Sequence, residues 1–231
     1  MMEKDKECLL SMLDSKGFTI FITFTITLIV IRVIYVIHRS GKPMRPKTSK
    51  PVSTLIVLGS GGHTAEMLNL LSVLQRGRFA PRYYIAAATD NLSLQKARMF
   101  ENSTNDETGV ATAEFMQIYR SREVGQSYIS SALTTSIAIA HALWLMIKIR
   151  PQVILCNGPG TCFPLCLIAF LFKIVGIKWP FIFYVESIAR VKKLSLCGLL
   201  LYKLRIADQF YVQWPQLQQK YHRALYVGCL M

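Results

Sequence analysis

The chain has 231 residues, enough for one sizeable folded core with a small appendage. Hydrophobic residues make up 52% of the sequence, which indicates contact with a membrane, and the formal net charge of +14 implies an acidic partner such as nucleic acid or an anionic membrane surface. The six cysteines show neither the C-x-x-C spacing of zinc sites nor a recurrent disulfide spacing, so we expect a reducing compartment and no bound metal.

An almost uninterrupted apolar run covers residues 18–38. About 20 apolar residues in a helix span the hydrocarbon core of a bilayer. A secretory signal peptide is the competing interpretation, but no small-residue cleavage site follows the run. We therefore predict one transmembrane helix at 18–38, with Arg32 near one end, where its side chain can reach the headgroups.

The charges on either side of this run predict its orientation. Residues 1–17 mix acidic and basic side chains, whereas residues 39–51 contain five basic side chains and no acidic one. Because basic flanks stay on the cytosolic side, we expect 1–17 to be a short lumenal N-terminus and the rest of the chain to be cytosolic. The three prolines in 39–51 predict a basic linker that can lie along an anionic membrane.

The segment 54–67, TLIVLGSGGHTAEM, predicts a buried strand, a tight loop and the first turn of a helix. Its glycines allow close approach of a ligand, and the unpaired amides of a helix N-terminus attract anions, so we predict a phosphate or diphosphate site. A dinucleotide fingerprint would need glycine where Thr64 stands, and a Walker loop would need a lysine. A glycine-rich connection without a ligand is the alternative.

Strand-like and helix-like segments alternate over residues 52–231, which predicts an α/β fold with a single Rossmann-like, doubly wound parallel sheet. Runs that are apolar throughout, such as 153–155, are typical of strands buried on both faces. The predicted strands are 55–58, 82–89, 114–119, 152–156, 179–185, 209–212 and 225–227. The predicted helices are 64–75, 92–100, 128–149, 162–175 and 194–206.

Ligands of such sheets bind at the carboxyl ends of the strands. Besides the glycine loop, that edge is expected to hold Arg120 and Arg122, whose guanidinium groups suit oxyanions, a second glycine-rich turn at 157–161, and Glu186. Each loop alone is compatible with ordinary turn chemistry. Their common edge predicts one anion-binding crevice.

Two further segments are candidates for membrane contact. Residues 127–147 contain no formal charge, but a second span there would place neighbouring strands of one sheet on opposite sides of the bilayer, so we reject it. An amphipathic helix in the membrane interface and an ordinary buried helix both remain open. Residues 190–205 combine leucines with basic side chains, which suits docking on acidic headgroups.

Five sequence blocks, in order, resemble one family. The family comprises the membrane-anchor subunits of the dolichol-linked N-acetylglucosaminyltransferase that adds the second sugar of the N-glycan precursor. The likeness extends from about residue 54 to the C-terminus. The N-terminal anchor resembles the family's anchor in type, but its individual residues do not match. The blocks are LGSGGHTAE at 58–66, RSREV at 120–124, LCNGPGTC at 155–162, YVESI at 184–188 and VQWP at 212–215.

This resemblance implies a GT-B glycosyltransferase of two Rossmann domains, divided between two chains. The chain is similar to the acceptor-side half of single-chain relatives such as the bacterial lipid II glucosaminyltransferase, and a soluble donor-binding subunit supplies the other half. The implied reaction transfers N-acetylglucosamine from its UDP sugar to N-acetylglucosaminyl-diphosphodolichol, with inversion and without a metal or other cofactor. The implied location is the cytosolic face of the endoplasmic reticulum membrane, with a single span, and the nuclear membrane.

The resemblance also implies the partners. These are the soluble subunit, the dolichol diphosphate sugar lipid, the membrane and the enzyme of the preceding dolichol step. The soluble subunit is expected to bind the C-terminal tail, Gly228, Cys229, Leu230 and Met231. Nucleic acid is not expected, because the basic residues flank apolar segments instead of forming an aromatic-interleaved patch. Independently of the resemblance, the roughly 180 residues after the linker hold one Rossmann domain, whereas a GT-B enzyme needs two.

An inverting transfer needs a base for the acceptor hydroxyl and groups that hold diphosphates. The candidate bases are His63 and Glu186, and His63 is favoured because histidine side chains ordinarily exchange protons near neutral pH. A base on the partner, or a purely non-catalytic anchor for a complete enzyme, are the alternatives. The candidate acceptor- and diphosphate-binding residues are Gly59, Ser60, Gly61, Gly62, Thr64, Glu66, Arg120, Arg122, Asn157, Gly158, Gly160 and Thr161.

Overall fold

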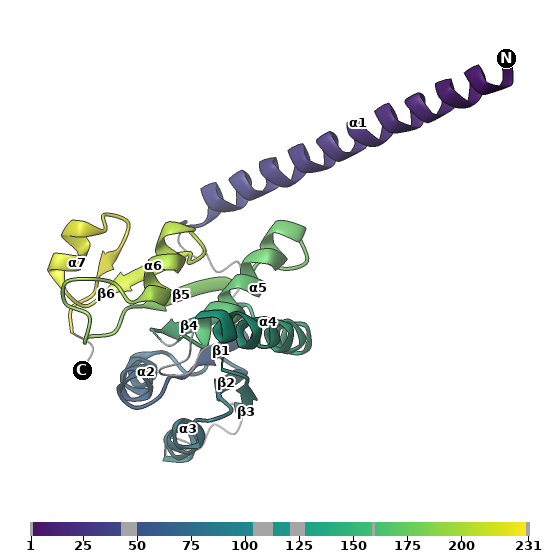
Figure 1. The fold of residues 1–231 in the computed structure, drawn as a ribbon. Coiled ribbons are helices and arrows are strands. Elements are labelled where there is room, and N and C mark those ends of the chain that lie inside the picture. The colour runs from purple at the N-terminus through teal and green to yellow at the C-terminus, as the bar shows by residue number, and fades with distance from the viewer. Residues whose placement is uncertain (1, 43–49, 104–112, 121–127, 159, 230–231) are drawn as a thin grey trace. The chain divides into compact units, whose positions relative to one another are not determined.

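The computed structural model describes residues 2–42, 50–103, 113–120, 128–158 and 160–229, and their side chains except those of 2–15 and 128–132. The chain divides into two compact units, Met1–Arg39 and Ser40–Met231. The first unit is a single helix, α1 (Met2–Arg39), and the second is an α/β domain (Figure 1). The linker segment 43–49 and Arg122 lie outside the described residues.

Helix α1 contains a segment, Lys16–Arg39, that is long and apolar enough to cross a membrane. The predicted span 18–38 lies within it, but the helix begins earlier than expected, at Met2. Three threonines in the apolar run, Thr23, Thr25 and Thr27, each donate a hydroxyl hydrogen bond to the carbonyl four residues earlier. These bonds satisfy the hydroxyl groups inside the helix, which removes much of the penalty for placing them in lipid.

The α/β domain alternates strands and helices, as predicted. Its strands are β1 (Thr54–Val57), β2 (Arg82–Ala87), β3 (Ala113–Ile118), β4 (Val153–Asn157), β5 (Phe181–Val185), β6 (Gln209–Val212) and β7 (Leu225–Tyr226). Its helices are α2 (Gly62–Val73), α3 (Asn91–Ser103), α4 (Tyr128–Ile149), α5 (Cys162–Val175), α6 (Leu196–Lys203) and α7 (Pro215–Lys220). Helix α7 was not predicted, and α6 is shorter than the predicted 194–206.

The strands form one sheet in the order β3-β2-β1-β4-β5-β6-β7. Every neighbouring pair is parallel, and Thr54 of β1 lies between Arg82 of β2 and Val153 of β4. The prediction of a doubly wound parallel sheet is therefore confirmed. The order reverses between β1 and β4, the position at which such sheets open a crevice for ligands.

Alternate side chains of the strands enter two separate apolar cores, one on each face of the sheet. On β1, Leu55 and Val57 pack into the core formed with α4, α5, α6 and α7, whereas Ile56, and Leu58 directly after the strand, pack into the core formed with α2 and α3. Figure 1 shows these two sets of helices around the sheet. Both faces of the central strands are buried, which explains why their sequences are apolar throughout.

Helix α4 connects β3 and β4, which belong to the same sheet, so the rejection of a second span is confirmed. One side of α4 is buried in the core through Ala142 and Met146, and the other side exposes Trp144 and Ile147. The buried-helix interpretation accounts for the first side. Contact of the second side with a membrane interface stays a prediction.

Candidate active site

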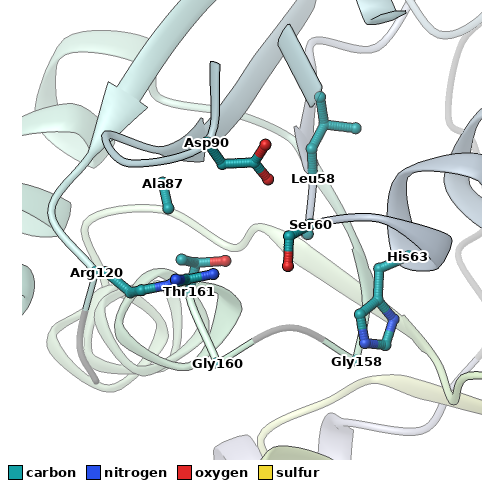
Figure 2. Close-up of a pocket in the computed structure, with 10 residues that line it drawn as sticks. Leu58, Ser60, His63, Ala87, Asp90, Arg120, Gly158, Gly160 and Thr161 are labelled. Atoms are coloured by element: carbon teal, nitrogen blue, oxygen red, sulfur yellow. The ribbon is translucent and has the colours of Figure 1, made fainter. Parts of the chain in front are cut away.

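A cavity of about 210 Å³ opens at the carboxyl edge of the sheet, over the junction of β1 and β4. The loops that follow β1, β2, β3 and β4 contribute to it (Figure 2). The loops after β1, β3 and β4 were expected there, the loop after β2 was not, and the expected loop after β5 supplies none of the described lining residues. Its lining residues are Leu58, Gly59, Ser60, His63, Ala87, Asp90, Arg120, Gly158, Gly160 and Thr161.

The glycine loop after β1 delivers His63 to this cavity. Gly61 has a φ of 63°, a left-handed conformation that side chains rarely adopt, and α2 begins at the next residue. The sharp turn places His63 in the first turn of α2, where it is half-buried and lines the cavity. Gly61 and Gly62 are exposed and shape the turn without lining the cavity.

The second glycine turn packs against the ring of His63. Gly158 also has a left-handed φ, of 65°. A Cβ atom at Gly158 would lie 2.7 Å from His63 Cε1, closer than Cβ atoms come to their neighbours, and 3.1 Å from Nδ1, which is tighter than most such contacts. The turn after β4 therefore needs glycine for its conformation and for the space that the imidazole occupies.

Hydrogen bonds connect His63 to the interior. Its Nδ1 atom lies 3.2 Å from Asn157 Oδ1, and Asn157 Nδ2 donates a 2.8 Å bond to Glu66 Oε2. The other carboxylate oxygen of Glu66 accepts a 2.8 Å bond from Ser187 Oγ and a 3.3 Å bond from the Ile188 amide. Glu66 and Asn157 were predicted to bind the diphosphate, but both are buried and neither lines the cavity.

Thr64 is also buried, and its hydroxyl is used inside the protein. It donates to the Gly59 carbonyl and lies 2.7 Å from Ser93 Oγ. Ser93 in turn donates a 2.7 Å bond to Asp90 Oδ2. These bonds tie the glycine loop to the start of α3, so Thr64 supports the loop and does not line the cavity.

Two polar groups face the cavity from other strands. Thr161 lines the cavity but is only 4% exposed, and among the described residues its buried hydroxyl has no hydrogen-bond partner. Arg120, after β3, supplies a half-buried guanidinium group. Asp90, after β2, lines the cavity and was not predicted; its place at the end of a strand was the signal that could have identified it.

Glu186, the second candidate base, does not reach the cavity. It is fully buried and accepts hydrogen bonds from the Ser195 amide and hydroxyl and from the Ser187 amide. Burial raises the pKa of its carboxyl above the ordinary value, although these hydrogen bonds oppose the shift. The hydrogen bonds connect Glu186 to Ser195, which caps the N-terminus of α6. This position favours a structural function.

The described tail residues Gly228 and Cys229 follow the last strand, and Leu230 and Met231 lie outside the described residues. Val227, just before the tail, lines a second, apolar cavity of about 230 Å³ together with residues of α2 and of three strands. This apolar groove is open, because the described helices α4 to α7 pack on the opposite face of the sheet. Its lining residues are Leu70, Leu74, Phe79, Leu155, Phe183, Val185, Tyr211 and Val227.

Two solved structures share this fold. The MurG protein of Acinetobacter baumannii superimposes with a TM-score of 0.51 over 72% of this chain, at 16% identity, and a UDP-N-acetylglucosamine 2-epimerase superimposes with a TM-score of 0.55 over 78%, at 17% identity. The chain corresponds to only 43% and 48% of the lengths of those two proteins. The expected likeness to one half of a larger, GT-B-like fold is thus confirmed.

Sequence comparison finds relatives that match this chain over most of their own length. The UDP-N-acetylglucosamine transferase subunit ALG14 of Yarrowia lipolytica is 44% identical over 89% of this chain and 94% of its own length. The human protein of the same name is 43% identical over 84% of this chain and 89% of its own length. The family model described as "Oligosaccharide biosynthesis protein Alg14 like" matches residues 54–230, the whole α/β domain with its glycine loops, and the chain therefore belongs to the Alg14 family.

Proposed function

We propose that this chain is the acceptor-binding, membrane-bound half of a two-chain glycosyltransferase. The enzyme transfers N-acetylglucosamine from UDP-N-acetylglucosamine to N-acetylglucosaminyl-diphosphodolichol, with inversion at the anomeric carbon. The observation that supports this most directly is His63, which lines a cavity at the switch point of a chain that has one Rossmann domain. Relatives named as transferase subunits match this chain over most of its length and of their own.

In the proposed reaction, His63 takes the proton of the acceptor hydroxyl. The hydroxyl oxygen forms a bond to the anomeric carbon of the donor sugar while the bond from that carbon to UDP breaks, and UDP leaves with the electron pair. Arg120 faces the acceptor diphosphate, and the Thr161 hydroxyl donates to one of its oxygens. Arg122 is proposed as a second diphosphate contact on the loop after β3.

The proposed setting is the cytosolic face of the endoplasmic reticulum membrane, with α1 as the single span. The basic residues after the apolar run 18–38 and the mixed charges of residues 1–17 before it support this orientation. The soluble donor-binding subunit is proposed to bind the C-terminal tail and the apolar groove that Val227 lines. A donor half on another chain also explains why we expect the isolated chain to be inactive.

The test is a transfer assay on the reconstituted complex with a short-chain diphosphate lipid acceptor. His63→Ala should lower kcat by a factor of about 10² to 10⁴, because a general base contributes that much. His222→Ala, which changes an exposed histidine away from the cavity, is the matched control and should keep full activity. Near-normal activity of His63→Ala in a complex that still assembles would instead favour a non-catalytic anchor.

The partner interface has a separate test. Val227→Glu places a charge in the apolar groove and should abolish co-purification of the soluble subunit, as should deletion of residues 228–231. Val175→Glu introduces the same charge at a residue of α5 that is 71% exposed, on the other face of the sheet, and should leave co-purification intact. Equal binding by all three variants would refute the proposed interface.

A further inference from the structure

A chain of hydrogen bonds behind the cavity ends at the ring of His63. Its members are Glu66, Asn157 and His63, joined by the 2.8 Å bond from Asn157 Nδ2 to Glu66 and the 3.2 Å contact between Asn157 Oδ1 and His63 Nδ1. Glu66 is 4% exposed and Asn157 is 2% exposed. Neither side chain lines the cavity; Asn157 contacts the base, and Glu66 contacts Asn157.

The chemistry of the three groups fixes the direction of these bonds. A carboxylate only accepts hydrogen bonds, so the amide NH₂ of Asn157 faces Glu66 and the amide carbonyl faces His63. A carbonyl also only accepts, so Nδ1 of His63 must hold the ring proton. A neutral imidazole has one such proton, and Nε2 therefore keeps its lone pair.

The carboxylate that starts the chain is itself held in place. Ser187 Oγ and the Ile188 amide donate to its other oxygen, from the loop after β5. Asn157 is the last residue of β4, and Glu66 follows His63 by three positions on α2, so it lies on the same side of the helix. Residues of α2, of β4 and of the loop after β5 thus fix the orientation of one imidazole.

We propose that Glu66 is a positioning residue that acts through Asn157 to hold His63 in its Nδ1–H tautomer, with Nε2 as the proton acceptor. The proposal rests on the proposed function of His63 as the base. In the transfer step, Nε2 takes the proton of the acceptor hydroxyl and the ring becomes an imidazolium. Its Nδ1–H stays bonded to Asn157 Oδ1, and neither Asn157 nor Glu66 gains or loses a proton.

Glu66→Gln tests this direction without changing the size of the side chain. Its carbonyl is expected to accept the bonds from Ser187 and the Ile188 amide, because that amide can only donate. The new NH₂ group then faces Asn157, whose amide must turn over and present NH₂ to His63 Nδ1. Nδ1 must accept that bond, and the ring proton moves to Nε2.

The readout is the tautomer of His63, measured by ¹⁵N NMR on the full chain in nanodiscs with its soluble partner. The chain has four histidines, so the His63 signals are identified by their loss in His63→Gln. The wild type should show a protonated Nδ1 and an unprotonated Nε2, and Glu66→Gln should show the reverse with a kcat lowered about 10²-fold. Ser187→Ala removes a bond from the same carboxylate but leaves Asn157 in place, so it should keep the wild-type tautomer.

The two readouts separate the two proposals. If the wild type holds its proton on Nε2, or if Glu66→Gln keeps the wild-type tautomer, the positioning function of Glu66 is refuted, whatever His63→Ala does. If Glu66→Gln reverses the tautomer but both it and His63→Ala remain fully active, the positioning of the ring stands and its function as the base is refuted. Reversal of the tautomer together with loss of kcat supports both.

Discussion

Gly158→Ala is the substitution for which the geometry of the cavity gives the clearest expectation. The added Cβ atom would lie 2.7 Å from His63 Cε1, whereas ordinary contacts begin at 3.4 Å, so the ring must retreat by about 0.7 Å. A displacement on the order of 1 Å at a catalytic group costs roughly 10² in rate. We therefore expect kcat of the complex to fall about 30- to 100-fold.

The cost in stability should be smaller than the cost in rate. Alanine in the left-handed conformation that Gly158 adopts loses about 1–2 kcal/mol, and the clash itself is relieved by a side chain at the edge of a cavity. Thermal unfolding should therefore show a modest loss while the domain still folds. The assay is steady-state transfer on the complex, normalised to the folded fraction.

The matched control is Gly77→Ala, at a turn where an added Cβ meets nothing within 4 Å. It should leave the rate unchanged and should not lower stability. A Gly158→Ala enzyme that keeps activity within about threefold of the wild type would refute the inference that this glycine determines the place of the imidazole. The same inference would be refuted if the rate fell only as far as the folded fraction of the enzyme falls.

Three further substitutions test other groups. Thr161→Val should lower kcat/KM about 2- to 12-fold without loss of stability, because it removes a hydroxyl that has no partner among the described residues and that we propose donates to the acceptor diphosphate. Arg120→Gln should raise KM for the diphosphate lipid about 10- to 100-fold with little change in kcat, as expected for loss of a charged contact made equally in the ground and transition states. Glu101→Gln should destabilise the domain by about 3–5 kcal/mol above pH 5, measured by urea unfolding, because it leaves the buried Arg82 unpaired.

The effect of Glu101 depends on pH with a definite sign. Burial raises the pKa of its carboxyl, but hydrogen bonds from Arg82 and Tyr84 lower it more, so the pKa lies below its ordinary value of 4.5. The stabilisation is present above pH 4.5 and is lost as pH falls through the folded-state pKa. The difference between wild type and variant should shrink on acidification, and a constant difference would contradict this assignment.

The other two substitutions also have controls. Lys96→Gln removes an exposed cation from α3 and should leave KM for the lipid unchanged, unlike Arg120→Gln. An equal rise in both variants would show a general effect of charge on the membrane surface and would contradict a specific contact of Arg120. For Thr161→Val, a loss of stability would show that the hydroxyl has a partner within the protein and would contradict its proposed contact with the acceptor diphosphate.

The sheet was predictable because each central strand has an apolar sequence and the segments that connect the strands are long enough to form helices. The location of the cavity was predictable for a topological reason, since parallel strands bring their carboxyl ends to one edge. The short helix α7 was not predicted, because six residues do not establish a helical period. Pro215 at its first turn was a usable signal.

The direction of individual side chains at that edge was not predictable. Glu66 and His63 are three residues apart on one helix, yet the first is bonded inward and the second lines the cavity. The difference depends on Asn157, 91 residues away, and on Ser187, 121 residues away. Patterns within a short window contain no information about such partners, so they identify the edge and leave the function of each polar residue open.

The proposed division of labour follows from the different physical states of the two substrates. The proposed acceptor is a lipid that cannot leave the bilayer, whereas the proposed donor is a soluble nucleotide sugar. A base that must meet the acceptor hydroxyl is best placed on the chain with α1, whose apolar segment is long enough to cross the same membrane. Of the described lining residues, Arg120 and Asp90 have opposite charges that offset one another, too little to balance two diphosphates at once. The donor diphosphate therefore needs cations from the second chain, which is the physical reason to expect activity only when the two halves meet.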